Sequence, residues 1–188
     1  MESSASITSP SAHTPEEGVR LGGDGAGRQI VLFEDPQCPY CRQFEEVSGK
    51  SLEAAREAGA VAVEYRMRCF LGVESVRADN ALALAAEAGR FDELRTEMFA
   101  AQPPEGTGGF TTEELLGLGE RVGLTGPDFV SGVNEGRYYA WVLKCEAVFQ
   151  EEDPQGTPAA WLDGQPVDPR VLMNPPAFAA LLRSGSSS

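Results

Sequence analysis

The sequence predicts an α/β protein in which a strand–helix–strand unit is followed by a long helical stretch and then by a returning strand. Apolar strand patterns at 28–34 and 61–69 enclose a helical pattern at 39–58. Residues 72–152 have helical patterns throughout, and strand character returns only at 159–162. Alternating elements of this kind are typical of a sheet covered by helices.

Composition excludes several classes of partner. The 188 residues are enough for one sizeable core. The net charge is −14, from 15 basic and 29 acidic side chains, which argues against nucleic acid or an anionic membrane surface. No run of apolar residues is long enough to span a membrane, and no signal-peptide pattern is present. We expect a cytoplasmic protein, or an extracytoplasmic one if an upstream signal or anchor has been removed.

The chain begins with a Ser-, Pro- and Gly-rich segment, 1–27, which is expected to be a flexible leader. The only histidine, His13, lies in this leader, which excludes catalytic dyads and triads that depend on histidine. Strand 28–34 ends at Asp35-Pro36, and helix 39–58 ends near Gly59. In strand 61–69 one face carries Val61, Val63, Tyr65, Met67 and Cys69, and a parallel crossover joins the two strands.

The helical insertion, about 72–152, contains four predicted helices at 75–88, 91–101, 111–122 and 137–150. The third opens with Thr111-Thr112-Glu113-Glu114, a capping-box pattern. After strand 159–162, Asp163-Gly164 predicts a hairpin turn toward Val167. A final helix at 176–182 precedes a flexible tail, 184–188. The folded domain is therefore expected over 28–183.

The most informative motif is Cys38-Pro39-Tyr40-Cys41, a C-x-x-C at the point where a strand is followed by a helix. The first turn of a helix has unsatisfied N–H groups and a partial positive charge, and both favour a thiolate. Cys38 is therefore the candidate nucleophile and Cys41 the candidate resolving thiol. Pro39 suits the first helical position, where its missing N–H costs nothing.

A second signal is Gly156-Thr157-Pro158, at the start of the returning strand. A proline that opens a strand beside a reactive dithiol suggests a cis peptide bond, which would bring the Thr157 backbone next to Cys38. By frequency alone, a trans proline at a strand edge is the more common arrangement.

Together these segments resemble the DsbA family of thioredoxin-fold proteins over about 28–183. The resemblance rests on Phe33 to Cys41, on the helical insertion with Phe91-Asp92-Glu93-Leu94 and Met98-Phe99-Ala100, and on Gly156-Thr157-Pro158 followed by Trp161-Leu162-Asp163-Gly164. It implies a thioredoxin-like fold with an all-helical subdomain inserted between the βαβ half and the cis-Pro strand.

The resemblance also implies a thiol-disulfide oxidoreductase without a cofactor or metal. Its redox pair would be Cys38 and Cys41, and its partners would be protein or peptide thiols and either a redox protein or glutathione. Pro39, Tyr40, Thr157 and Pro158 would contact substrate. Strongly oxidising family members have histidine where this chain has Tyr40, which predicts a Cys38 pKa that is depressed less than in those members.

One departure concerns the buried acid that many thioredoxin-fold enzymes carry six residues before the first cysteine. Leu32 occupies that position here. Glu34 points to the same face of the strand and could serve as the proton acceptor for Cys41. The alternative is that Glu34 is a solvated charge at the strand end.

The other two cysteines also have two interpretations. Cys69 lies on an apolar strand face and Cys145 on the apolar stripe of its helix, so both are expected to point inward. They are either isolated buried thiols or a structural disulfide that ties the insertion to the core.

Three other classes of function remain. C-P-Y-C is also the usual glutaredoxin motif, which would make glutathione the partner, although the long insertion is foreign to a compact glutaredoxin. A zinc site would need the four cysteines to converge, and their spacing is unlike paired C-x-x-C ligands. A protein-binding module would not need both Cys38 and Cys41.

Overall fold

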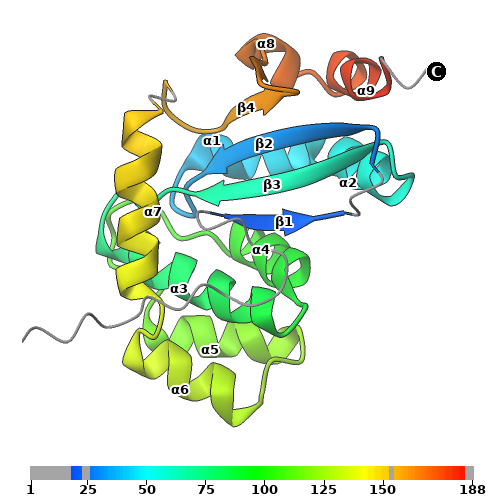
Figure 1. Ribbon diagram of the computed structural model, residues 1–188. Helices are drawn as coiled ribbons and strands as arrows, with labels where there is room; N and C mark the ends of the chain where they lie inside the picture. Colours follow the sequence, from blue (N-terminus) through cyan, green and yellow to red (C-terminus); the bar gives the residue numbers. More distant parts are fainter. Residues whose placement is uncertain (1–17, 23–25, 153–154, 185–188) are drawn as a thin grey trace, which may run out of the picture.

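The computed structural model describes residues 18–22, 26–152 and 155–184 (Figure 1). Most of the predicted leader, including His13, and most of the predicted tail lie outside the described residues.

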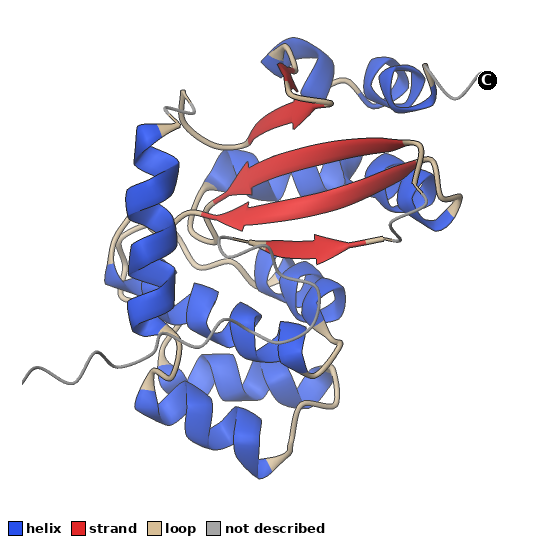
Figure 2. Cartoon of the chain, in the orientation of Figure 1, coloured by secondary structure: helices blue, strands red, loops and turns tan. Residues whose placement is uncertain are grey.

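A five-stranded sheet forms the centre of the fold (Figure 2). Its order is β1-β3-β2-β4-β5, with bounds β1 Val19–Leu21, β2 Arg28–Glu34, β3 Val61–Met67, β4 Ala159–Leu162 and β5 Gln165–Pro166. The predicted parallel pairing of β2 with β3 is confirmed. Strand β4 pairs antiparallel with β2, and the predicted turn at Asp163-Gly164 joins β4 to β5. Both turn residues have positive φ, as a tight hairpin turn requires.

Strand β1 corrects the prediction of a leader without structure through residue 27. Val19 is buried, and Val19–Leu21 pairs antiparallel with β3. The segment is only three residues long and is flanked by glycines, so its own sequence has no strand period; pairing with β3 creates the strand.

The predicted helix at 39–58 is present, with one local change. It comprises α1 (Pro39–Phe44), a π-helical turn η1 (Glu45–Gly49) and α2 (Lys50–Glu57). Pro39 occupies the first turn of α1, as predicted. Such π turns are rare and occur often beside functional sites.

The insertion holds one helix more than the sequence predicts. Its elements are α3 (Val73–Glu87), α4 (Phe91–Ala100), α5 (Thr112–Arg121), α6 (Pro127–Glu135) and α7 (Tyr139–Glu151). The predicted capping box at Thr111 and Glu114 is confirmed. The unpredicted helix α6 ends at Gly136 in the left-handed conformation, and Gly132 lets it approach α3, since an added Cβ would lie 2.5 Å from a Leu84 methyl.

Two short helices follow the sheet, α8 (Pro169–Leu172), which was not predicted, and α9 (Pro175–Arg183), which was. Helix α9 packs on α2, and the rings of Phe44 and Phe178 meet edge to face at 5.8 Å. In Figure 1, α3 to α6 gather on the β1 side of the sheet, whereas α8 and α9 lie beyond β4.

Buried apolar side chains of the sheet and the insertion form one continuous cluster within the described residues. The insertion therefore shares its core with the sheet. A small separate cluster contains Cys38, Cys41 and Phe99, with Leu71 packed against it. This second cluster marks the place where sheet, α1 and insertion meet.

Candidate active site

The two sulfurs of the C-x-x-C motif lie where β2 is followed by α1. Cys38 is the N-cap residue of α1, and its N–H donates to the Asp35 carbonyl at 2.9 Å. Cys38 is 5% exposed, whereas Cys41, one turn into the helix, is completely buried. Both are free thiols in this structure. Only Cys38 can therefore be reached by another thiol.

The environment separates the acidities of the two thiols. A hydrogen bond from Cys41 lowers the pKa of Cys38 to about 6, and helix N–H groups add to the effect against the cost of burial. Burial raises the pKa of Cys41 well above its usual range, and the hydrogen bond to Cys38 and the Glu34 charge raise it further. One thiol is thus suited to attack as a thiolate, while its partner holds its proton.

The segment before β4 lies directly against Cys38. The Cys38 Sγ donates to the Thr157 carbonyl at 3.3 Å, and the peptide bond between Thr157 and Pro158 is cis. The Thr157 hydroxyl is buried and has no hydrogen-bond partner within the described chain. The structure therefore brings together two motifs that lie 119 residues apart in the sequence.

The insertion holds the active-site loop through two glutamines that the sequence analysis did not single out. Gln102, which follows α4, donates through its amide to the carbonyls of Pro36 and Cys38 at 2.7 and 3.0 Å. Gln37 donates to the Leu71 carbonyl and the Ser75 hydroxyl. No local pattern marks these residues, because their role depends on how the insertion packs.

Glu34 is buried at the end of β2, so it is not a solvated strand-end charge. Arg95, from α4, donates two hydrogen bonds to its carboxylate, at 2.7 and 2.6 Å, and a third at 2.7 Å to Glu45. Burial raises the pKa of Glu34 because it disfavours the carboxylate more than the Arg95 guanidinium favours it. The sequence analysis missed Arg95, since nothing local pairs it with β2.

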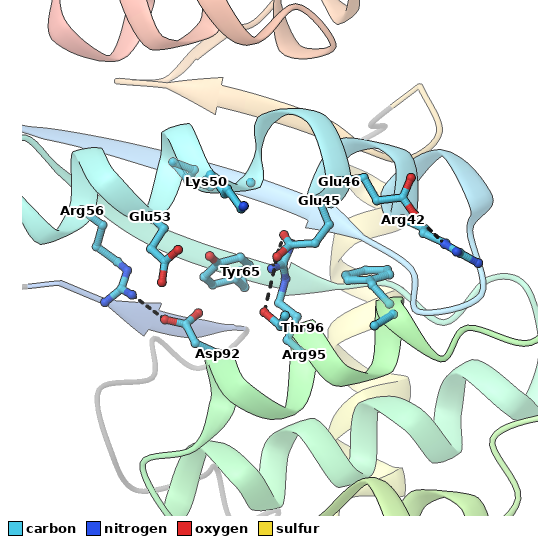
Figure 3. A pocket seen from close by; sticks show the side chains of 14 residues that line it. Arg42, Glu45, Glu46, Lys50, Glu53, Arg56, Tyr65, Asp92, Arg95 and Thr96 are labelled. Carbon is cyan, nitrogen blue, oxygen red and sulfur yellow. Dashed lines mark hydrogen bonds and ion pairs between the residues drawn. The ribbon is translucent and has the colours of Figure 1, made fainter. Parts of the chain in front are cut away.

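Arg95 lies at the inner side of a cavity of about 490 Å³ between α1, α2 and α4 (Figure 3). Its guanidinium lies over the rings of Tyr65 and Phe99, at 4.9 and 5.0 Å from their centroids. Phe99 also contacts the two redox thiols. The cavity thus reaches the rear of the redox site.

Asp35 was predicted only as the end of a strand, and the structure places it beside the dithiol. Its side chain is fully buried and accepts hydrogen bonds from the Gln37 and Leu71 N–H groups and from the Ser75 hydroxyl. Burial raises its pKa to about 6 against the effect of these donors. A signal was present in the sequence, since this acid lies three residues before Cys38.

The remaining predicted contact residues lie at the surface. Tyr40 is 65% exposed, so it carries no packing role and is free to meet a partner. Phe70 and Val73, on either side of the loop that holds Leu71, are also exposed.

Cys69 and Cys145 are both buried, as predicted. The Cys69 N–H donates to the Glu146 carboxylate at 3.0 Å, so Cys69 lies against the turn of α7 that carries Cys145. Arg68 holds the same carboxylate with two bonds of 2.8 Å. Cys69 is a free thiol in this structure, and burial raises its pKa. The pairing of Cys69 with Cys145 stays a prediction.

Within the described ranges, no three His, Cys, Asp or Glu side chains gather as metal ligands do, and no helix is long and apolar enough to cross a membrane. All four cysteines belong to these ranges, and Cys69 and Cys145 are not part of the cluster that holds Cys38 and Cys41. Their arrangement therefore gives no support to a zinc site.

Comparison with known proteins agrees with the geometry. A family model described as thioredoxin matches residues 14–174. A search of curated protein sequences gives no significant match.

Solved structures match nearly the whole chain. The reduced disulfide bond oxidoreductase DsbG from Mycobacterium tuberculosis has a TM-score of 0.80 at 22% identity, over 93% of this chain and 90% of that one. Reduced DsbA from the same organism has a TM-score of 0.78 at 22% identity, over 92% and 93%. MdbA from Actinomyces oris, a thiol-disulfide oxidoreductase, has a TM-score of 0.76 at 19% identity, over 92% and 87%. The predicted fold class is confirmed, and the chain belongs to the thioredoxin family, with a DsbA-like fold.

Proposed function

We propose that this protein is a thiol-disulfide oxidoreductase that exchanges the Cys38–Cys41 disulfide or dithiol with cysteines of protein substrates. The observation that carries the proposal is the contrast between the two thiols, one acidic at a helix N-terminus and the other buried with a raised pKa. This contrast is what a nucleophile and a resolving thiol need. The names of the matched structures, DsbG, DsbA and MdbA, agree with this chemistry.

In the oxidising direction, a substrate thiolate attacks the Cys38 sulfur of the disulfide and Cys41 leaves as a thiolate that takes up a proton. The second substrate thiolate then attacks the substrate sulfur of the mixed disulfide. Cys38 leaves as a thiolate, and the substrate has lost two electrons to the dithiol. In the reducing direction, Cys38 attacks first and Cys41 releases the product.

Substrate is expected to dock as an extended peptide against the segment before β4. The Thr157 backbone would pair with it in the manner of an added strand. Pro158 would shape this site, while Pro39 and the exposed Tyr40 would contact the substrate beside Cys38. The close approach of the Thr157 carbonyl to Cys38 supports this assignment.

Glu34 is proposed as the proton acceptor for Cys41. Its raised pKa and its electrostatic effect on Cys41 support the role. Arg95 would position the carboxylate through its two hydrogen bonds.

The expected cytoplasmic location has no support from the matched structures. We propose the alternative, an oxidising extracytoplasmic compartment, because a disulfide donor works where disulfides persist. There Cys69 and Cys145 would form a structural disulfide. The redox partner is proposed to be a second protein or glutathione, and no observation favours the glutaredoxin alternative.

Refolding of reduced ribonuclease A by the oxidised protein tests the proposal. We expect recovery of ribonuclease activity with the wild type and none with Cys38→Ser. In the reducing direction, Cys41→Ser mixed with ribonuclease that carries mispaired disulfides should accumulate a mixed disulfide, because Cys38 attacks a substrate disulfide and the resolving thiol is absent. The proposal would be wrong if Cys38→Ser refolded ribonuclease as well as the wild type.

A further inference from the structure

The Asp35 carboxyl joins three separate segments of the chain. Its Oδ1 accepts from the Gln37 N–H at 2.9 Å and from the Ser75 hydroxyl at 2.6 Å. Within the described residues, its Oδ2 accepts only from the Leu71 N–H, at 3.2 Å. One buried group therefore ties the active-site loop to α3 and to residues 68–72, which follow β3.

The same residue contacts both cysteines of the motif. The Asp35 carbonyl accepts the Cys38 N–H, and a backbone hydrogen bond from Asp35 favours the Cys41 thiolate. The Leu71 side chain packs against the Cys38 and Cys41 cluster. A change in the protonation of the Asp35 carboxyl therefore acts on Leu71, which is in contact with Cys38 and Cys41.

The charges around Asp35 make its ionisation sensitive to the redox state. The titratable groups that face it are Cys38 at the start of α1, Asp79 on α3 and Cys69 after β3. No cation is among the charges that act on it within the described residues. Asp79 is fully buried, and neither of its oxygens has a hydrogen-bond partner in the described chain, so burial raises its pKa well above the usual range. The Cys38 thiolate is then the variable charge next to Asp35.

We propose that Asp35 is a redox-linked positioning residue, whose carboxyl takes up a proton when the Cys38–Cys41 disulfide is reduced and thereby loosens its hydrogen bond to Leu71. This inference rests on the proposed function. A disulfide carries no charge, whereas a Cys38 thiolate repels a buried carboxylate. The proton is expected on Oδ2, which accepts one long bond, because Oδ1 is occupied by two shorter ones.

The disulfide gains two electrons from a dithiol reductant, which becomes a disulfide. Cys38 is left as a thiolate, one proton goes to Cys41 and a second to Asp35. Burial is the main cause that raises the pKa of Asp35 to about 6 and the Cys38 thiolate adds a smaller part, so this second uptake is partial and strongest near pH 6. The Leu71 amide, next to the exposed Phe70, is then held less firmly in the reduced protein, whereas Gln37 still holds the Leu71 carbonyl and Glu146 still holds Cys69.

Infrared difference spectra of the full chain, reduced minus oxidised with dithiothreitol at pH 6, test the proton uptake. We expect a carbonyl band of a neutral carboxyl to appear on reduction of the wild type and to be absent in Asp35→Asn. Asp79→Asn is the matched control, since it removes the neighbouring buried acid, and the band should remain. Ser75→Ala removes one donor from the carboxylate, so the band should persist to higher pH than in the wild type.

Hydrogen exchange of the Leu71 amide measures whether its hydrogen bond to Asp35 weakens on reduction. Exchange should be faster in the reduced than in the oxidised wild type, and equally fast in both states of Asp35→Asn, because Asn resembles the neutral acid. In Cys38→Ala, dithiothreitol should have no effect on it. If Asp35→Asn fails to fold, Ser75→Ala still tests the inference, because its carboxyl band should persist to higher pH than in the wild type.

Redox titration against pH separates this inference from the proposed function. Each extra proton changes the equilibrium constant for reduction tenfold per pH unit, or about 30 mV for two electrons. Between pH 5 and 7 the wild type should take up more protons per reduction than Asp35→Asn. Equal proton uptake, or a carboxyl band that survives Asp35→Asn, would overturn the inference alone. Absence of any redox transition would overturn the proposed function as well.

Discussion

Arg95 on α4 donates two hydrogen bonds to the Glu34 carboxylate at the end of β2, and both side chains are buried. The pair connects the insertion to the strand that leads into the redox motif. Removing one partner of a buried ion pair leaves an uncompensated charge, which is more costly than the net value of the pair.

Arg95→Met is therefore expected to destabilise the protein by about 3–5 kcal/mol. Urea unfolding monitored by circular dichroism measures the change. Arg121→Met, which breaks an exposed pair with Glu97, is the control and should cost less than about 1 kcal/mol. Adding Glu34→Gln to Arg95→Met should restore part of the loss. If Arg95→Met and Arg121→Met lowered the free energy of unfolding equally, burial of the ion pair between Arg95 and Glu34 would be unimportant.

Glu34→Gln is expected to slow the release of substrate from the mixed disulfide and to flatten the pH dependence of this step. The reason is that Cys41 would lose its proton acceptor, while the helix N–H groups around Cys38 stay in place. Rapid-quench measurement of the mixed disulfide gives the rate. If the rate and its pH profile were unaltered, Glu34 would have no part in proton transfer.

The Cys38 pKa of about 6 sets the pH dependence of the first step. Attack by Cys38 should weaken as the pH falls through 6, because the thiolate is protonated. The pKa is depressed on folding, so the thiolate stabilises the reduced protein fully above pH 9 and no longer below pH 6. Thiolate absorbance against pH measures the titration of Cys38, and urea unfolding of the reduced protein against pH measures its stability. A thiolate that titrates near pH 9 would contradict both expectations.

Tyr40→His is expected to lower the Cys38 pKa further and to make the protein a stronger oxidant. An imidazolium beside the sulfur favours the thiolate, whereas the exposed Tyr40 carries no positive charge. Tyr40→Phe is the uncharged control. An unchanged pKa in Tyr40→His would remove this explanation of how the motif sets the potential.

A count of thiols tests the pairing of Cys69 with Cys145. The air-oxidised protein, denatured without reductant, should expose no reactive thiol if both bridges form. Such a bridge closes a loop of roughly 75 residues and would raise the free energy of unfolding by about 4–5 kcal/mol in the chain-entropy model. Two reactive thiols would mean that only the redox pair is oxidised.

The sequence predicted the parts of the site that depend on local chemistry. A C-x-x-C between strand and helix and a proline before a strand are readable without a structure, and both lie where these patterns indicate. Arg95, Gln102 and the bonds of Asp35 to Leu71 and Ser75 were not predictable, because each joins segments far apart in the sequence. Their partners are fixed only when the insertion packs on the sheet.

The same distinction explains the fold. Strand β2 has an apolar run and helix α4 a helical pattern of its own, and both were placed almost to the residue. Strand β1 exists through pairing with β3, and α6 through its close approach to α3 at Gly132. The sequence of β1 or of α6 alone therefore does not predict the element, because each depends on contact with another part of the chain.

The reduction potential of the Cys38–Cys41 couple, measured by equilibration against glutathione buffers, tests the central claim most directly. We predict a single two-electron transition between the potentials of DsbA, about −120 mV, and thioredoxin, about −270 mV, that is lost in Cys38→Ser. A potential near that of DsbA would indicate a disulfide donor, and a potential near that of thioredoxin would indicate a reductase. A protein without a measurable transition would contradict the assignment of Cys38 and Cys41 as a redox pair.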